Sequence, residues 1–495
     1  MPKDQFVAID IGAESGRAVL ASLENDRLSL EERHRFSTPA GRMNGSLHWN
    51  LLGIWEEIKA GLRRCAVDGG QKRQIDSIGL DAWGVDFGLI APSGEVLGNP
   101  VHYRDRRTEG VMEKVFQRVS RQRIFDTTGV QFMPINTLYQ LVAMQQAKSS
   151  LLAAAETLLF MPDLFNYLLT GKKQSEYSIA TTSQMFNPRK RAWADELLHE
   201  LELPRHILPI VAPSGTVVSS LRKEMAAECR MNTVPVIAPG SHDTASAVVA
   251  VPGEGDNWCF ISSGTWSLMG VELAAPLITE KSLRYDYTNE GGVGGRIRFL
   301  KNITGLWLVQ ECKRYFKSQG QDLDYPELER LSAAAPSLQS IIDPDHAPFR
   351  APGDIPKKIE RFCAATGQRP PTGPGDFVRT CLESLAMTYR RTLTGLEDLL
   401  GKKIKTIHVV GGGSQNSLLN QMTADACARP VVAGPSEATA IGNALVQGIT
   451  MGSVKSIEHA RSIVKNSFEL KRFEPRETKA WDAAFTRYQE IRQQH

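Results

Sequence analysis

An acidic residue, a hydroxyl residue and two glycines lie in a short turn near the start of the sequence. Asp10 and Gly12 end one apolar run, and Ser15 and Gly16 precede the next. Small residues let backbone amides approach an anion, and Ser15 adds a hydroxyl donor. The Asp10 carboxylate could hold Mg²⁺, which uses few protein ligands and keeps several waters. The pattern fits a phosphate and magnesium site, and it also fits an ordinary hairpin turn with an acidic cap.

Two later turns have the same small, polar character. Residues 262–265 (Ser-Ser-Gly-Thr) separate two apolar runs, and residues 411–413 are three glycines after the apolar run 404–410. The first turn could bind another part of a polyphosphate, and the second could let a nucleotide lie against the backbone. Each could equally be only a tight turn. The chain has neither a Gly-x-x-x-x-Gly-Lys-Ser/Thr run nor the glycine loop of protein kinases with its partners, which excludes those two phosphoryl-transfer frameworks.

A histidine and an aspartate follow a predicted strand in the middle of the chain. Residues 234–238 are apolar, and His242 and Asp243 come shortly after them. At a strand end, Asp243 could face a cleft and act on a substrate there. The alternative is a helix start in which Asp243 caps residues 245–249 and His242 is a structural histidine. Spacing alone leaves both interpretations open.

Two further segments combine aromatic and charged residues. Residues 79–87 (Gly-Leu-Asp-Ala-Trp-Gly-Val-Asp-Phe) end a strand with an aromatic, a glycine and two carboxylates, which suits sugar hydroxyls and the apolar face of a ring or chain. Core packing of Trp83 is the alternative. Residues 103–107 (Tyr-Arg-Asp-Arg-Arg) could add polar contacts to a ligand or form a structural ion-pair cluster.

Alternating strands and helices are predicted to position these residues. Apolar runs predict strands at 6–11, 18–20 and 27–36, and the spacing of apolar residues predicts a helix over 51–62. This alternation indicates an α/β fold. Near residue 252 the pattern of strand, hydroxyl-rich glycine turn and strand begins again, which suggests duplication of a lobe.

A long helix and a second strand-glycine-helix unit are predicted in the C-terminal half. Asp376 can cap a helix that ends at Gly401 and buries one apolar face. A strand over 404–410, the three glycines and a helix through Met422 follow. The core face of the long helix carries Val378, Leu382, Leu385, Tyr389, Leu393 and Leu396.

Composition excludes several classes of protein. The 495 residues suggest two or three domains, at roughly 150 residues each. The 58 Lys and Arg nearly balance 55 Asp and Glu, and the short basic clusters lack interleaved aromatics, so nucleic acid is not expected as a partner. No apolar stretch approaches the ~18 residues of a membrane span, and the N-terminus lacks the pattern of a secretory signal, which predicts a cytoplasmic location. The seven cysteines lack Cys-x-x-Cys spacing, so we expect reduced, mostly buried thiols and no zinc site.

Taken together, these segments resemble the FGGY carbohydrate kinase family over nearly the whole chain. The resemblance implies an actin-like ATPase fold of two ribonuclease H-like lobes with an inter-lobe cleft. The N-terminal lobe, 1–248, would bind sugar and hold the first phosphate motif and the catalytic aspartate, and the C-terminal lobe, 249–495, would bind nucleotide. The matching motifs are residues 10–17, 79–87, 103–108, 131–141, 241–248, 262–270, 289–310 and 409–421.

The resemblance also implies the reaction and the residues that perform it. The reaction would be ATP-dependent phosphorylation of L-rhamnulose at its primary 1-hydroxyl, in L-rhamnose degradation, with Asp243 as the base and Asp10 holding Mg²⁺. Many members carry Thr directly after the first Asp-x-Gly, where this chain has Ala13 and Glu14, so Ser15 must supply the hydroxyl. The residues implied for ATP are Ala13, Glu14, Ser15, Gly16, Arg17, Thr265, Gln310 and Gly412, and those for the sugar are Gly84, His242, Asp243, Thr244 and Asn302.

Two alternatives stay open at this point. A kinase of the same family could act on L-fuculose, L-ribulose or xylulose, because a methyl or an inverted hydroxyl changes binding by only ~1–3 kcal/mol. An actin-like ATPase or a sugar-responsive regulator could bind nucleotide for conformational signalling, although no helix-turn-helix is recognised. The sequence leaves monomer and dimer equally open.

Overall fold

The computed structural model describes residues 4–494 and divides into two compact units. As far as they are described, the first unit holds Met1–Pro252, Glu272–Leu300 and Glu437–Ser467, and the second holds Gly253–Val271, Lys301–Ser436 and Phe468–His495. Each unit is therefore assembled from three separate stretches of chain. The predicted roles of 1–248 in sugar binding and of 249–495 in nucleotide binding stay predictions.

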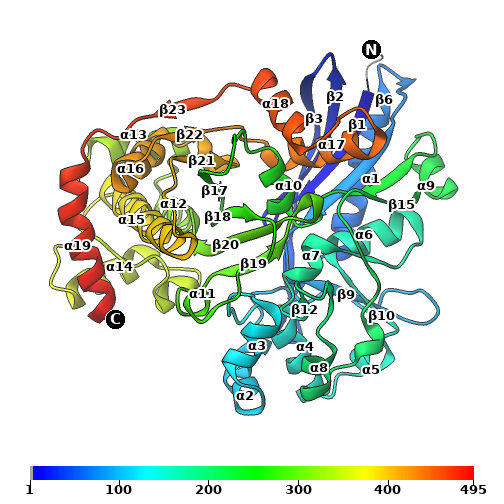
Figure 1. Ribbon diagram of the computed structural model, residues 1–495, viewed down its shortest axis with the longest axis horizontal. Coiled ribbons are helices and arrows are strands. Elements are labelled where there is room, and N and C mark those ends of the chain that lie inside the picture. The colour runs from blue at the N-terminus through cyan, green and yellow to red at the C-terminus, as the bar shows by residue number, and fades with distance from the viewer. Residues whose placement is uncertain (1–3, 495) are drawn as a thin grey trace. The chain divides into compact units, whose positions relative to one another are not determined.

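Strands and helices alternate along the chain, as predicted (Figure 1). The strands are β1 (Asp4–Ile11), β2 (Ser15–Glu24), β3 (Arg27–Ser37), β4 (Ala40–Met43), β5 (Ser46–Trp49), β6 (Val67–Asp68), β7 (Gln71–Lys72), β8 (Ser77–Ala82), β9 (Phe87–Ile90), β10 (Thr157–Phe160), β11 (Ser175–Glu176), β12 (Phe186–Asn187), β13 (Ala192–Trp193), β14 (Val211–Ala212), β15 (Thr216–Ser220), β16 (Pro235–Ala238), β17 (Trp258–Ser263), β18 (Trp266–Leu273), β19 (Thr288–Gly291), β20 (Ile297–Thr304), β21 (Thr406–Val410), β22 (Val431–Ala433) and β23 (Lys471–Phe473). The helices are α1 (Leu51–Ala66), α2 (Val111–Arg118), α3 (Arg121–Thr128), α4 (Thr137–Gln146), α5 (Ser150–Ala154), α6 (Met161–Thr170), α7 (Tyr177–Thr181), α8 (Asp195–Glu200), α9 (Lys223–Glu228), α10 (Asp243–Val249), α11 (Glu280–Arg284), α12 (Trp307–Ser318), α13 (Tyr325–Ala334), α14 (Ile355–Ala365), α15 (Pro374–Leu400), α16 (Ser417–Cys427), α17 (Ala438–Met451), α18 (Ile457–Ser467) and α19 (Thr478–Gln494).

A six-stranded sheet organises the first unit, with the strand order β15-β16-β8-β1-β2-β3. β1 pairs antiparallel with β2 and parallel with β8, and β16 pairs parallel with β8. The carboxyl ends of β1, β8 and β16 therefore meet at one edge of the sheet. Asp10 lies opposite Asp81 in this register, and Ala82 bridges to His242 just beyond β16.

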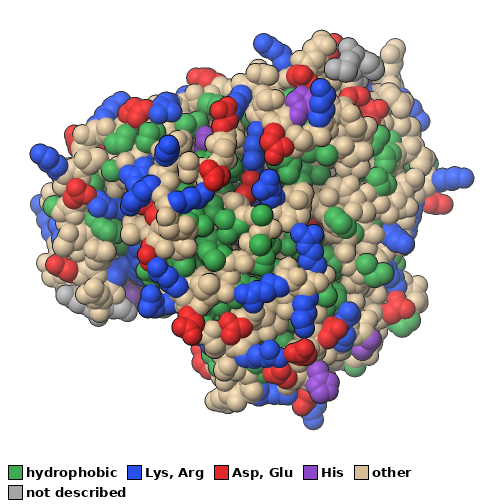
Figure 2. Space-filling model, viewed as in Figure 1, with side chains coloured by type: hydrophobic (Ala, Val, Ile, Leu, Met, Phe, Trp, Pro, Cys, Tyr) green, Lys and Arg blue, Asp and Glu red, His purple; other side chains and the backbone are tan. Residues whose placement is uncertain are grey.

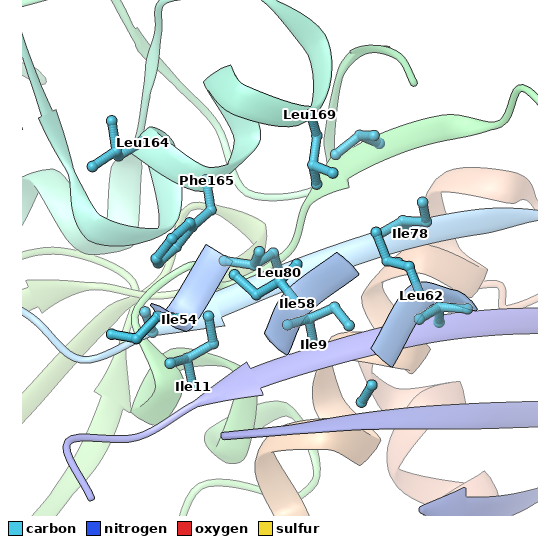
Figure 3. Close-up of a cluster of buried hydrophobic side chains, with 14 of the residues drawn as sticks. Ile9, Ile11, Ile54, Ile58, Leu62, Ile78, Leu80, Leu164, Phe165 and Leu169 are labelled. Atoms are coloured by element: carbon cyan, nitrogen blue, oxygen red, sulfur yellow. The ribbon is translucent and has the colours of Figure 1, made fainter. Parts of the chain in front are cut away.

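The two faces of this sheet contact different helices. The side chains of Ile78 and Leu80 in β8 join a buried cluster with α1 and α6, which Figure 3 shows in close-up. The intervening residues Gly79 and Asp81 face α17, where Asn443 donates to Asp81. This alternation follows from the two-residue period of a strand. The apolar face of α1 expected from its sequence is confirmed, because Ile54, Ile58 and Leu62 are all fully buried.

The second unit repeats the same strand pattern. β17 pairs antiparallel with β18 and parallel with β21, and β22 pairs parallel with β21 and antiparallel with β23. α15 lies against α16, α13 and α12. The predicted echo between the two halves of the chain is thus a repeat of hairpin followed by parallel strands.

Two predicted caps differ from the structure. α15 begins at Pro374 with Gly373 as its N-cap, and Asp376 lies in the first turn, where its carboxylate accepts from the Thr372 hydroxyl at 2.8 Å. The cap predicted at Asp376 is therefore wrong, because Pro374 already suits the first helical position. Gly401 ends the helix in a left-handed conformation, as predicted. The helix start expected in the alternative for Asp243 is present, since α10 begins at Asp243, but its N-cap is His242.

The surface carries charges of both signs. Figure 2 shows one face on which Lys and Arg side chains are interspersed with Asp and Glu side chains. All seven cysteines are buried and free, as expected for reduced thiols. Among residues 4–494, no helix is long and apolar enough to cross a membrane.

Candidate active site

Three aspartates approach one another at the carboxyl edge of the first unit's sheet. Asp10 is the penultimate residue of β1, Asp81 is the penultimate residue of β8, and Asp243 begins α10 after β16. Burial, together with the negative charge of Asp10, raises the pKa of Asp81 far above its ordinary value. Burial is also the main cause that raises the pKa of Asp10, and Arg17 opposes it. The cluster concentrates acidic groups where β1, β8 and β16 end.

Arg17 is the cation beside this cluster. Its Nε lies 2.9 Å from the Asp10 carboxylate, and its Nη1 pairs with Glu437, which precedes α17. Burial lowers the pKa of Arg17, but the charges of these two carboxylates outweigh it and raise the pKa, so the guanidinium stays charged. Glu14 is exposed at the turn.

The turn between β1 and β2 is short because its backbone closes on itself. The Gly12 amide donates to the Ser15 carbonyl at 2.9 Å, and the hairpin register pairs Ile11 with Gly16. A Cβ at Gly16 would overlap the ring of Phe36, so a side chain has no room there. The five residues implied for ATP phosphates, Ala13, Glu14, Ser15, Gly16 and Arg17, lie in or directly after this turn.

Asp243 is held by its own helix. One of its oxygens, Oδ1, accepts from the Thr244 amide at 2.5 Å and from the Thr244 hydroxyl at 3.1 Å. His242 Nε2 lies 3.4 Å from the same oxygen. Among the described residues, Oδ2 receives no hydrogen bond. The Asp243 side chain is 31% exposed, so Oδ2 can accept a proton from a substrate.

Gly84 lies so close to His242 and Thr182 that a side chain there would be crowded. A Cβ built there would lie 3.3 Å from Thr182 and 3.4 Å from His242 Nε2. Val85, the next residue, has φ of 68°, which is strained for a β-branched side chain and is held by a bond from its amide to the Thr182 hydroxyl. The structure thus brings together four of the residues implied for the sugar: Gly84, His242, Asp243 and Thr244.

Glu176 supports the segment that carries His242 and Asp243 from behind. Its buried carboxylate accepts from the Ser178 hydroxyl at 2.6 Å, from the Ser241 amide at 3.2 Å, and from the Ser214 hydroxyl. Ser178 in turn accepts from the His242 amide at 3.0 Å. One carboxylate therefore holds two consecutive backbone amides in place. No motif identified in the sequence included Glu176.

We expect Glu176→Ala to lower the free energy of unfolding by at least about 2 kcal/mol, because it leaves several buried donors without an acceptor. Turnover should fall by a larger factor than the KM for sugar rises, because the backbone segment that carries Asp243 shifts. Glu176→Gln keeps an acceptor oxygen at the same place and should restore most of both properties. Urea unfolding and steady-state kinetics measure the two effects, and equal losses in the two variants would contradict this role.

Trp83 and Asp86 are core residues. Asp86 is fully buried and accepts from Trp49 Nε1 at 2.7 Å, Trp83 Nε1 at 3.1 Å, the Tyr103 amide at 3.1 Å and Gln140 Nε2 at 3.1 Å. The core-packing alternative therefore holds for Trp83, and the Asp86 carboxylate is occupied by four donors of the core. Likewise, the Asp105 carboxylate accepts from the Leu47 and Arg107 amides. Within residues 103–107, Asp105 therefore has a structural role.

Burial raises the pKa of Asp86 to about 6, against an ordinary value of 3.8. Because the folded state binds this proton more tightly than the unfolded chain, the ionisation penalty is absent below about pH 4 and complete above about pH 6. Relative to Asp86→Asn, the wild type should lose on the order of 3 kcal/mol of stability as pH rises through this window. Urea unfolding of both proteins from pH 4 to 7 measures it, and a constant difference between them would refute the prediction.

The residues implied for nucleotide in the second unit lie near two glycine turns. Gln310 Nε2 in α12 donates to the Thr265 hydroxyl at 3.1 Å, so these two side chains are together. Gly411 has φ of 82°, and a Cβ at Gly413 would overlap the Ser263 hydroxyl, so the glycine turn packs closely on β17. Gly412 is exposed with open space around it. Asn302, implied for sugar, lies in the part of β20 that belongs to this unit.

The acidic edge of the first unit also fits a magnesium ion. Asp81 Oδ1 is buried and has no hydrogen-bond partner among the described residues. No group of three or more His, Cys, Asp and Glu side chains able to enclose a metal is found in residues 4–494. Mg²⁺ typically takes one or two carboxylates together with waters and phosphate oxygens, so this sparse donor set suits it.

Several residues around the aspartates were not identified from the sequence. Asn443 and Gln447 lie one turn apart on α17, and Gln447 donates to Asn443 and accepts from Ser77. Two side-chain amides four residues apart in a largely apolar helix are the sequence signal that could have identified Asn443 and Gln447. Glu437, Arg298 and Glu290 carried no such local signal.

Comparison with known proteins decides the family. Residues 5–250 match the N-terminal domain of the FGGY family of carbohydrate kinases, and residues 259–451 match its C-terminal domain. The chain belongs to the FGGY family of carbohydrate kinases. The family resemblance inferred from the motifs is thereby confirmed.

Relatives of this carbohydrate kinase match it over nearly its full length. A rhamnulokinase of Bacteroides thetaiotaomicron is 42% identical over 486 residues, which cover 98% of this chain and 99% of that protein. A rhamnulokinase of Oceanobacillus iheyensis is 41% identical over 464 residues, covering 94% of this chain and 97% of its own.

Solved structures confirm the predicted fold class. The ligand-bound xylulose kinase from Lactobacillus acidophilus has a TM-score of 0.79 at 16% identity, covering 99% of this kinase and 98% of that chain. The glycerol kinase of Plasmodium falciparum with ADP has a TM-score of 0.78 at 14% identity, covering 98% of both chains. At such identities the likeness concerns the fold alone.

Proposed function

We propose that this kinase transfers the γ-phosphoryl group of ATP to the primary 1-hydroxyl of L-rhamnulose, giving L-rhamnulose 1-phosphate and ADP, in L-rhamnose degradation. The observation that carries the substrate is the 42% identity to a rhamnulokinase over nearly the whole chain. The observation that carries the chemistry is the partly exposed Asp243 side chain beside His242 and Gly84.

In the proposed reaction Asp243 Oδ2 accepts the proton of the primary hydroxyl as that oxygen attacks the γ-phosphorus. The bonds from Thr244 hold the carboxylate in orientation, and His242 donates toward the sugar. Because the transition state of phosphoryl transfer is loose, positioning and charge stabilisation matter more than basicity. We assign the sugar contacts to Gly84, His242, Asp243, Thr244 and Asn302.

We assign the polyphosphate of ATP to residues 13–17, Thr265 and Gln310, and the adenosine to Gly412. The amides of the β1–β2 turn and the Arg17 guanidinium would offset phosphate charge. Asp10 would hold Mg²⁺, which when bound neutralises charge on the phosphate oxygens. The cytoplasmic location stays a prediction. The oligomeric state stays open between monomer and dimer.

ADP release tests this proposal most directly. It is measured with Mg²⁺-ATP alone and then with L-rhamnulose, L-fuculose, L-ribulose, D-xylulose and glycerol, comparing kcat/KM. We expect L-rhamnulose to be preferred by orders of magnitude over a low background without sugar. Preference for another ketose would leave the proposed mechanism in place and change only which sugar is assigned to the pocket. Release that ignores every sugar would favour the actin-like ATPase or regulator and contradict the kinase proposal.

A further inference from the structure

A fully buried arginine contacts the histidine next to Asp243. Arg298 in β20 has no exposed surface; its Nε donates to the Gly291 carbonyl at 2.8 Å, and its Nη2 lies 3.1 Å from His242 Nδ1. The same Nη2 lies 3.2 Å from Glu290 Oε2. Burial lowers the pKa of Arg298, while the charges of Glu290, Glu176, Asp243 and Glu272 oppose that change.

The direction of this contact determines where the histidine carries its proton. A guanidinium has five N–H donors and no acceptor, and it stays protonated in proteins. A hydrogen bond from Arg298 therefore requires a lone pair on His242 Nδ1. The single proton of the ring must then lie on Nε2, because a neutral imidazole has one N–H and an imidazolium has no lone pair.

We propose that Arg298 is a positioning residue that keeps His242 neutral with its proton on Nε2. His242 Nε2 lies 3.4 Å from Asp243 Oδ1, and Gly84 lies beside it, since a Cβ built at Gly84 would come within 3.4 Å of Nε2. His242 is then restricted to donating, either to Asp243 or to an oxygen of the sugar. Asp243 remains the proton acceptor of the pair.

Glu290 provides the competing arrangement. Its Oε2 lies 3.3 Å from His242 Nδ1, so a proton on Nδ1 could be donated to this carboxylate if Arg298 were absent. The charged groups facing the imidazole are thus Asp243 from α10, Glu290 from β19 and Arg298 from β20. Arg298 excludes the arrangement that Glu290 alone would favour.

The ring nitrogens of His242 report the tautomer directly. We would record ¹⁵N spectra of the full-length protein labelled at its ten histidines, with His242→Asn identifying the resonances. The expected result for the unliganded wild type is a protonated Nε2 and an unprotonated Nδ1. A proton on Nδ1, alone or in an imidazolium, would overturn the proposal, and this measurement requires no variant of Arg298 to fold.

Two variants then separate positioning from a merely structural role. Arg298→Met removes the donor and should move the proton toward Nδ1, raising the KM for sugar about tenfold or more with little change in the KM for ATP. Glu290→Gln removes the negative charge of the competing acceptor and should leave the proton on Nε2. Arg298→Gln retains an N–H donor and should restore the wild-type tautomer where Arg298→Met does not. Loss of sugar and ATP affinity together, with an unchanged tautomer, would count against the proposal.

The role in sugar binding depends on the proposed function, but the tautomer does not. Spectra without ligand test the Arg298 contact even if the sugar panel selects another ketose. If the panel finds no sugar-dependent turnover while Nε2 is protonated, the proposed function fails and the tautomer assignment stands.

Discussion

Asp243→Asn is expected to lower turnover by roughly 10² to 10⁴ while leaving sugar binding nearly unchanged. The amide oxygen of asparagine can still accept both bonds from Thr244, so the side chain keeps its orientation. Its amide nitrogen then stands where Oδ2 was and cannot accept the proton of the attacking hydroxyl. Steady-state kinetics with saturating ATP, together with calorimetric titration of the sugar, measures both quantities.

Asp195→Asn is the matched control for this substitution. Asp195 is the first residue of α8 just as Asp243 is the first residue of α10, so both changes remove a negative charge from a helix N-terminus. Asp195 pairs with Arg205 at the surface, and such an exposed pair contributes little. We expect near wild-type turnover from the control. Retention of near-full turnover by Asp243→Asn would remove Asp243 from the role of base.

Gly442→Ala is expected to give the largest loss of stability, with loss of activity as a consequence. Gly442 lies where α17 crosses α10, and a Cβ there would overlap the carbonyl oxygen of Ser246. Backbone cannot rotate away as a side chain can, so α10 must shift and carry Asp243 with it. Overpacking of this kind costs about 1–3 kcal/mol or more, and a displacement near 1 Å can lower catalysis about 10²-fold.

Gly448→Ala controls for the gain in helix propensity on the same helix. A Cβ at Gly448 would lie 2.8 Å from Val454 Cγ2, which is the end of a side chain. Thermal unfolding and turnover of the two variants should separate, with Gly442→Ala clearly the more damaging. Similar melting temperatures and similar turnover would contradict the close packing of α10 on α17.

Local patterns predicted the elements well because they depend on neighbouring residues. The apolar spacing from Leu51 to Leu62, the strand of Phe6 to Ile11 and the helix end at Gly401 are all present in the structure. The N-cap predicted for α15 at Asp376 is wrong because Pro374 already suits the first helical position. Trp83 was open between sugar contact and core packing, because only burial separates the two.

The sequence by itself determined the alternating strands and helices, the family, and which polar residues stand at strand ends, since periodicity and motifs are properties of contiguous chain. Only the tertiary structure decided which distant residues surround them. Asn443 reaches Asp81 across 362 residues of sequence, and Arg298 reaches His242 across 56. Such contacts depend on how separate stretches of chain pack together. The position of the proton on His242 follows from that packing, because Arg298, which no local pattern connects to His242, determines it.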